Sequence, residues 1–396
     1  MMYYYLLMLI FVFSLQGISA QSLKTGAAQP EKYLSLLKDK KVGLVVNQTS
    51  RIGDRHLLDF LLEQQVDVEK IFCPEHGFRG NADAGEKIGD QQDPETGLPV
   101  ISLYGDNKKP SESQLREIDI IVFDLQDVGV RFYTYLSTMH YIMEACAENN
   151  LPLVLLDRPN PNGDYVAGPV LKPAFRSFVG MEPIPVVYGC TLGELAGMIN
   201  GEGWLNHGER CDLTVVPVEN YTHRTRYSLP VKPSPNLPND IAVRLYPSLC
   251  FFEATNVSIG RGTMFPFQVI GYPDPGMGKF GFTPASIEGM EKHPKQEGKI
   301  CYGEDLRDAC LNQKFSLSYF LNYYRKFSKE ENFLSSERWF DLLAGTDQVL
   351  KDIRAGKSLE EIEASWQDDL NHYLELRKKY LLYPEKKDRK VTRSQE

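Results

Sequence analysis

The sequence has few of the residue patterns that build metal sites and disulfide frameworks. Its seven cysteines are odd in number, and no two of them are spaced as a Cys-x-x-Cys pair. Its seven histidines form no His-Glu-x-x-His segment, and no calcium-binding loop of the EF-hand type occurs. We therefore expect no disulfide framework, no zinc site and no histidine-rich metal site.

The common nucleotide-binding and serine-nucleophile motifs are also missing. No Gly-x-Gly-x-x-Gly segment follows a predicted strand, and the chain has neither a phosphate-binding loop of the P-loop type nor a Gly-x-Ser-x-Gly elbow. The glycines at 276 and 278 lie in a region without regular periodicity, which argues against a phosphate-binding role. We expect no cofactor.

Basic residues are fewer than acidic residues. The 44 Lys and Arg are outnumbered by 53 Asp and Glu, which gives a formal net charge of −9. Proteins that bind nucleic acid normally present a basic face, so no nucleic-acid partner is expected. A few arginines in a pocket can still bind an anionic ligand against the overall charge.

Long apolar runs are absent apart from one at the N-terminus. Residues 6–15 are nearly all apolar, and small residues at 18–20 precede Gln21. This pattern predicts a signal peptide over 1–20, although residues 1–5 carry no Lys or Arg. The run is shorter than the ~20 residues of a membrane-spanning helix, so no stable membrane anchor is expected. The prediction is an exported bacterial protein, periplasmic or extracellular, and no oligomeric state is indicated.

From residue 41 the chain alternates between strand and helix patterns. Repeated units of this kind predict a parallel sheet with helices on both faces. Two further pieces, 184–188 with its helix and 213–218, extend the pattern. After residue 220 the alternation of strand and helix patterns ends. A proline-rich segment, a glycine-rich stretch and several predicted helices follow. We place an α/β domain at 21–215, an α+β domain at 216–384 and a charged tail at 385–396. The predicted strands are 42–47, 68–72, 100–103, 118–125, 151–156, 184–188 and 213–218, and the predicted helices are 55–65, 132–149, 192–199, 318–326, 335–344 and 359–380.

Polar side chains follow several of these strands. Ligands of open parallel sheets bind outside the carboxyl ends of the strands, so these residues are the first candidates for a site. They are Glu75 and His76 after the second strand, Asp124, Asp127 and Arg131 after the fourth, and Asp157, Arg158 and Asn160 after the fifth.

Each candidate also has a structural interpretation. Glu75 follows a proline and could be an acidic residue at a helix N-terminus. Asp124 and Asp127 could bond backbone N–H groups of a loop, and Asn160 lies in a turn-forming segment. Arg131 could belong to a structural ion pair. Asp124, Asp127 and Asp157 could instead form a magnesium site, which leaves a metal-dependent hydrolase as an alternative.

Several segments together resemble a known family, the exo-β-N-acetylmuramidases. The matching segments extend from about residue 40 to 384. They are 74–80 (Pro-Glu-His-Gly-Phe-Arg-Gly), 124–135, 157–161, 234–238 (Ser-Pro-Asn-Leu-Pro), 252–256 (Phe-Glu-Ala-Thr-Asn), 260–263, 343–347 and 380–384.

The resemblance implies a Rossmann-like domain joined to a smaller C-terminal domain, with the site in the cleft between them. It implies removal of N-acetylmuramic acid from the non-reducing end of peptidoglycan fragments, so a muropeptide or related glycan is the expected substrate. Glu75 is then the predicted catalytic acid. A non-catalytic muropeptide-binding protein is the other alternative.

Glycoside cleavage usually needs a second carboxylate, and the sequence leaves three candidates: Asp124, Asp127 and Glu253. The substrate's own acetamido group could also replace a protein nucleophile. Arginines bind carboxylates such as the lactyl group of muramic acid in bidentate fashion, which favours Arg131 and Arg158. The residues that we predict to bind the substrate are His76, Arg131, Tyr133, Asp157, Arg158, Asn160, Asn256 and Arg261.

Overall fold

The main sheet has seven strands. The computed structural model describes residues 22–75, 77–78, 91–327 and 329–385, so the predicted signal peptide and His76 lie outside the described residues, as does the charged tail from 386 onward. All neighbouring strands run parallel except the edge pair β5 and β6. Their order across the sheet is β11 (Leu213–Val216), β8 (Leu153–Leu156), β7 (Ile120–Asp124), β1 (Lys41–Val46), β4 (Asp67–Cys73), β6 (Pro99–Ser102) and β5 (Gln91–Gln92).

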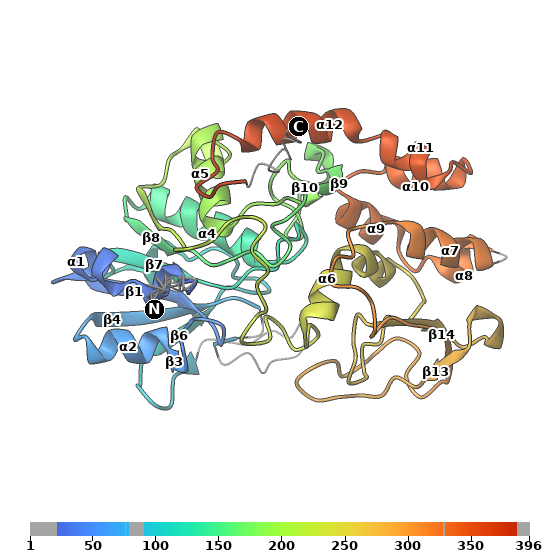
Figure 1. Cartoon of the computed structure of the whole chain (residues 1–396). Coiled ribbons are helices and arrows are strands. Elements are labelled where there is room, and N and C mark those ends of the chain that lie inside the picture. The colour runs from blue at the N-terminus through green and yellow to red at the C-terminus, as the bar shows by residue number, and fades with distance from the viewer. Residues whose placement is uncertain (1–21, 76, 79–90, 328, 386–396) are drawn as a thin grey trace, which may run out of the picture.

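Helices cover both faces of this sheet, as predicted. In β7, Ile121 and Phe123 point into one apolar cluster, and Ile120 and Val122 point into another. This alternation puts two buried faces on one strand, which explains why the segment is almost entirely apolar. Figure 1 shows the helices around the sheet. One face carries α4 (Tyr135–Glu148) and α5 (Leu192–Glu202), and the other carries α1 (Leu34–Leu37) and α2 (Leu57–Glu63), while α3 (Glu112–Leu115) precedes β7.

One predicted strand does not extend the main sheet. The segment expected at 184–188 forms β10 (Pro185–Val187), which pairs antiparallel with β9 (Ala167–Val170) in a separate two-stranded sheet. A second small pair joins β2 (Arg51–Ile52) and β3 (Arg55–His56). The apolar pattern predicted the strand correctly, but periodicity carries no information about which strand will be its partner.

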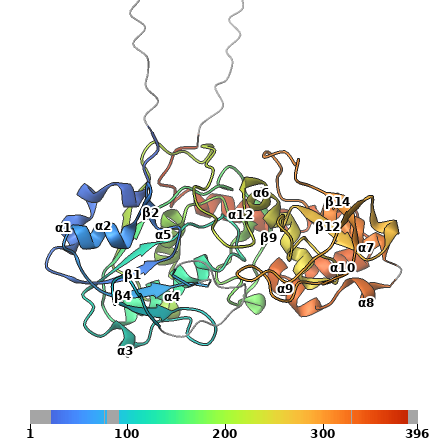
Figure 2. The same ribbon diagram turned by 90° about the horizontal axis from the view of Figure 1, so that it is seen from below.

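The C-terminal region is smaller and mixes helices with a three-stranded antiparallel sheet. Figures 1 and 2 both place it beside the main sheet. The helix expected over 359–380 is divided in two near Ser365, whose hydroxyl donates to the carbonyl of Ile362 (2.7 Å) at the end of the first helix. The strands are β12 (Val269–Tyr272), β14 (Cys301–Asp305) and β13 (Phe280–Phe282), and the helices are α6 (Asp240–Leu249), α7 (Ser318–Lys326), α8 (Glu330–Phe333), α9 (Glu337–Ala344), α10 (Gln348–Arg354), α11 (Leu359–Ala364) and α12 (Gln367–Arg377).

Short 3₁₀ helices complete the described chain, and one of them contributes to the site. They are Gly26–Ala28, Pro30–Lys32, Pro173–Phe175, Asn206–Gly208, η5 (Cys250–Ala254) and Pro275–Met277.

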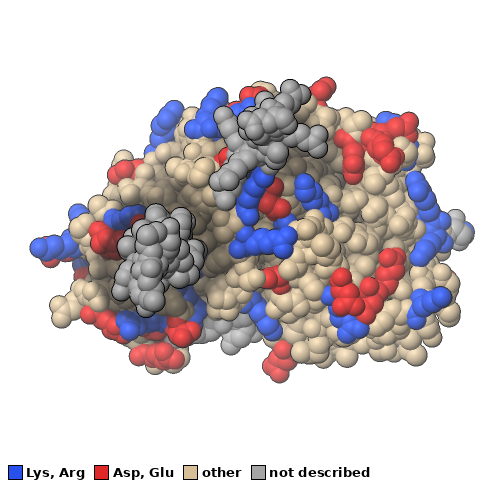
Figure 3. Space-filling view, viewed as in Figure 1, with Lys and Arg blue, Asp and Glu red and all other residues tan. Residues whose placement is uncertain are grey.

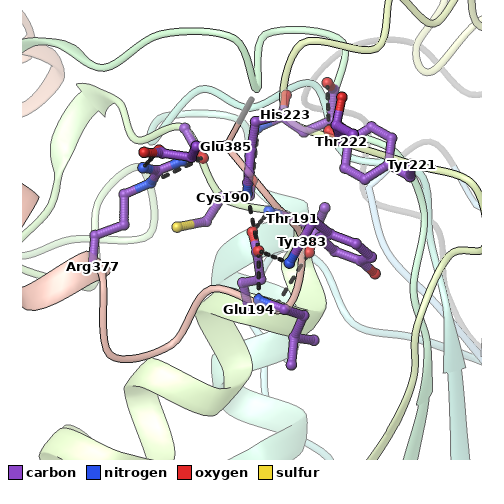
Figure 4. A network of polar contacts seen from close by, with 12 residues as sticks. Cys190, Thr191, Glu194, Tyr221, Thr222, His223, Arg377, Tyr383 and Glu385 are labelled. Atoms are coloured by element: carbon purple, nitrogen blue, oxygen red, sulfur yellow. Dashed lines mark hydrogen bonds and ion pairs between the residues drawn. The ribbon is translucent and has the colours of Figure 1, made fainter. Parts of the chain in front are cut away.

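The end of the chain returns to the sheet domain. After α12, the backbone N–H groups of Leu382 and Tyr383 donate to one carboxylate oxygen of Glu194 at the start of α5 (2.9 and 3.3 Å), which also contacts His223 (3.0 Å). Nearby, Arg377 pairs with Glu385, as Figure 4 shows. Glu194 is fully buried, so these contacts satisfy a charge that would otherwise be costly. They fix the C-terminal region to the sheet domain.

Acidic and basic side chains are interspersed over the face in Figure 3 rather than gathered into one basic surface. Within the described residues, no helix is long and apolar enough to cross a membrane.

Candidate active site

A cavity of about 400 Å³ lies where the strand ends of the main sheet meet the C-terminal region. Glu75 follows β4, Tyr104 follows β6 and Thr134 precedes α4, so the sheet domain supplies one wall. Glu253 in η5 and Arg261 after it belong to the opposite wall. A cavity of this size is in the range of roughly 300–1,000 Å³ that small-ligand sites occupy.

Glu75 is held on the sheet side of the cavity by hydroxyl groups. The hydroxyl of Thr134 donates to its carboxylate (2.9 Å). Burial raises the pKa of Tyr104 well above its usual value, and the charge and hydrogen bond of Glu75 raise it further. Tyr104 therefore keeps its proton near neutral pH and can donate it in a hydrogen bond to Glu75.

Glu253 has a different environment. Its carboxylate lies 2.5 Å from the Arg261 guanidinium, which also stacks over the ring of Phe267 (5.1 Å to the centroid). Burial alone would lower the pKa of Arg261, but the charge of Glu253 raises it above the usual value. The charge of Glu253 also raises the pKa of Tyr104, so Glu75 and Glu253 act on the same phenol.

The aromatic residue predicted to bind substrate lies in the cavity wall. Tyr133 is largely buried, and its hydroxyl donates to the backbone carbonyl of Pro233 (2.7 Å). This bond fixes the proline-rich segment against the sheet and brings Ser234 and Asn236 into the wall. Trp339 also lines the cavity, from α9. Neither Asn236 nor Trp339 is among the residues predicted from the sequence, although Asn236 belongs to the Ser-Pro-Asn-Leu-Pro segment that resembles the family.

The carboxylates after β7 do not line the cavity. Asp124 is fully buried and pairs with Arg158, whose guanidinium nitrogens lie 2.5 and 2.8 Å from its two oxygens. Asp127 accepts hydrogen bonds from the Tyr188 hydroxyl and the Gly129 backbone, and burial raises its pKa to about 6. Both side chains are occupied by protein contacts, so the geometry gives neither of them, nor Arg158, a place against a ligand in this cavity.

Arg131 is also withdrawn from the cavity. It is fully buried, and its guanidinium donates to the backbone carbonyls of Pro169, Ile184 and Leu343, each at 2.8 Å. These bonds join the β9–β10 sheet to the end of α9. One of the two arginines that were expected to bind the lactyl carboxylate therefore joins two parts of the fold.

Three other predicted binding residues have structural contacts outside the cavity. Asp157 accepts hydrogen bonds from the hydroxyls of Thr191 (2.6 Å) and Tyr383 (2.5 Å), and burial raises its pKa to about 6. Asn160 donates to the Cys190 carbonyl (2.7 Å). Asn256 donates to a backbone carbonyl near α8 (3.1 Å). None of the three is among the residues that line the cavity.

The three aspartates considered for magnesium are thus separately engaged by Arg158, Tyr188 and Tyr383. Among the described residues, no group of three or more His, Cys, Asp or Glu side chains is arranged to hold a metal ion.

Comparison with known proteins assigns the family. A model of the N-terminal part of the exo-β-N-acetylmuramidase NamZ matches residues 42–241, and a model of its C-terminal part matches residues 244–383. The chain belongs to the NamZ family. The peptidoglycan β-N-acetylmuramidase NamZ of Bacillus subtilis (strain 168) is 38% identical over 372 residues, which cover 89% of each chain.

Two solved structures have a similar fold. A DUF1343 family protein from Bacteroides fragilis NCTC 9343 is 46% identical, with a TM-score of 0.85 over 92% of this chain and 100% of that one. A second protein from the same strain is 29% identical, with a TM-score of 0.78 over 91% and 99% of the two chains. The expected family and the Rossmann-like sheet with a smaller C-terminal region are confirmed, while the domain boundary near residue 215 stays a prediction.

Proposed function

We propose that this protein is an exo-acting glycoside hydrolase that releases N-acetylmuramic acid from the non-reducing end of peptidoglycan fragments. The observation that carries the proposal is the position of two carboxylates, Glu75 and Glu253, on opposite walls of one sugar-sized cavity. The Bacillus subtilis relative is a peptidoglycan β-N-acetylmuramidase, which supports the choice of substrate.

The two carboxylates differ in a way that suits different roles. Glu75 accepts a hydrogen bond from the neutral hydroxyl of Thr134, whereas Glu253 is paired with the Arg261 cation. Glycosidases separate an acid from an ionised carboxylate by giving the two groups unlike environments. We assign Glu75 as the general acid that protonates the leaving oxygen, and Glu253 as the ionised group that faces the developing positive charge at the anomeric carbon.

Two further points belong to the same proposal. Of the three arginines predicted to bind the substrate, Arg261 is the one that lines the cavity, so we assign substrate contact to it and structural roles to Arg131 and Arg158. We also propose that the protein is exported, as its N-terminal residues predict. Fractionation of the cells that produce it tests this, and a cytoplasmic location of the full-length chain would contradict it.

A chromogenic β-glycoside of N-acetylmuramic acid tests the function directly. We expect release of the chromophore with or without EDTA. On a disaccharide, whose leaving sugar must be protonated, we expect Glu75→Gln to lose activity. Activity that EDTA abolishes and magnesium restores would instead indicate a metal-dependent hydrolase. Binding of muropeptides without release of any sugar would indicate a binding protein.

A further inference from the structure

Two cavity-lining side chains each have a buried polar atom without a hydrogen-bond partner in the described part of the chain. These atoms are Oδ1 of Asn236 and Nη1 of Arg261. Asn236 is only 3% exposed. Buried polar atoms are nearly always hydrogen-bonded in folded proteins, so exceptions on the wall of a cavity indicate where a ligand completes the bonding.

Each of these two atoms can take only one role in a hydrogen bond. The amide nitrogen of Asn236 donates to the backbone carbonyl of Met290 (2.9 Å). A carbonyl can only accept, so the nitrogen must face Met290, and the remaining atom is the oxygen, an acceptor. A guanidinium nitrogen can only donate. These two side chains therefore offer one unpaired acceptor and one unpaired donor.

Both side chains are attached to the same short stretch of the C-terminal region. Asn236 bonds the carbonyl of Met290, and Arg261 Nη1 lies 3.6 Å from the carboxylate of the next residue, Glu291. That distance is an ionic contact but too long for a hydrogen bond. Because Met290 and Glu291 are consecutive, the acceptor and the donor belong to one part of the cavity wall.

The pair is also held in place before any ligand arrives. The segment that carries Asn236 is fixed by the bond from Tyr133 to Pro233 (2.7 Å). Arg261 is fixed by its ion pair with Glu253 and by its contact with Phe267. Preorganised groups lose little conformational entropy on binding, so they can discriminate between ligands.

We propose that Asn236 and Arg261 together recognise a secondary amide of the substrate. The amide N–H donates to Oδ1 of Asn236, and the amide carbonyl accepts from Nη1 of Arg261. A secondary amide presents one donor and one acceptor, which is the complement of the two unpaired atoms of Asn236 and Arg261. The inference rests on the proposed function, because that function makes this cavity the substrate site. Two such amides of a muropeptide are attached closest to the sugar ring: the 2-acetamido group, and the bond between the lactyl group and the peptide stem.

The Asn236→Ala variant tests the proposal with matched substrates. We would measure kcat/KM for nitrophenyl glycosides with the 2-acetamido group and for 2-deoxy analogues, each with and without a peptide stem. For substrates with the recognised amide, the kcat/KM of the variant should be about tenfold lower than that of wild type, which is the usual effect of losing one uncharged hydrogen bond. For substrates without that amide it should lose little. Any loss of folded protein lowers all four rates alike and cancels in their ratios. Asn371→Ala, on the exposed surface of α12 and outside the cavity, should leave every rate unchanged.

The substrates also identify which amide is bound. A loss confined to 2-acetamido substrates assigns the pair to the sugar, and a loss confined to substrates with a stem assigns it to the lactyl–peptide bond. Equal losses on all four substrates would overturn the proposal. Calorimetric binding of the unlabelled sugars separates this inference from the proposed function. If no glycoside is cleaved, yet wild type prefers the amide-bearing sugar and Asn236→Ala does not, amide recognition holds and the hydrolase assignment fails.

Discussion

Replacement of Glu75 by glutamine is the most informative change to the site. The glutamine amide keeps an oxygen that accepts the hydrogen bond from Thr134, so the local structure should persist. It cannot supply a proton to the leaving oxygen. General acid catalysis contributes about 10²–10⁴-fold, so we expect kcat/KM to fall by that factor on a natural disaccharide, a rise of roughly 3–5 kcal/mol in the barrier.

The effect of the same variant should also depend on the leaving group of the substrate. A leaving group such as dinitrophenolate departs without protonation, so its glycoside should lose much less than a sugar leaving group. Steady-state kinetics with both substrates measures the difference, and Glu63→Gln on the surface of α2 serves as a control that should match wild type. Equal losses on both leaving groups would refute the acid role of Glu75, and so would near-normal turnover of the disaccharide.

Three further predictions concern charge. Glu253→Gln should lower kcat by about 10²–10³-fold, because it removes an electrostatic stabiliser of the transition state, while the far-ultraviolet circular dichroism stays unchanged. Asp124→Asn should lower the free energy of unfolding by about 3–5 kcal/mol in urea titrations, because it leaves Arg158 buried without its counter-charge. Burial alone would lower the pKa of His140, but its contacts with two glutamates raise it to about 8. A raised histidine pKa contributes stability that is complete below about pH 6.5 and is lost as the pH rises through 8, about 2 kcal/mol in total, and His140→Gln should abolish this dependence.

Much of the fold could be predicted because its signal is local. The strand β7 is a continuous apolar run, since both of its faces are buried, and such runs alternate with helical patterns along the first half of the chain. The sequence could not predict which strands pair with one another. Whether the segment at 184–188 joins the main sheet depends on β9, and no feature of either segment alone shows that they meet.

The site residues, too, could be predicted only in part, because local sequence does not show which residues meet in the folded chain. Glu75, Tyr133, Glu253 and Arg261 were selected from the sequence and do line the cavity. The other described candidates also follow strands or belong to family segments, but they bond to protein groups outside the cavity, several of which are distant in sequence.

Asp157 illustrates why this could not be foreseen. Its carboxylate is bonded by Tyr383, which is 226 residues away and arrives only when the chain end folds back onto α5. A position after a strand predicts that a side chain lies near the sheet edge. It does not predict whether other residues of the protein form hydrogen bonds with that side chain. Asn236 was not selected for the converse reason: its own segment follows no predicted strand, and the bond that orients its amide comes from Met290, 54 residues away.

Product analysis by liquid chromatography and mass spectrometry on a disaccharide with N-acetylmuramic acid at its non-reducing end tests the central claim most directly. Wild type should release free N-acetylmuramic acid, and folded Glu75→Gln should release it at least a hundredfold more slowly, by the estimate of about 10²–10⁴-fold for a general acid. Absence of free N-acetylmuramic acid with folded wild type would contradict the account, as would an undiminished rate in the variant.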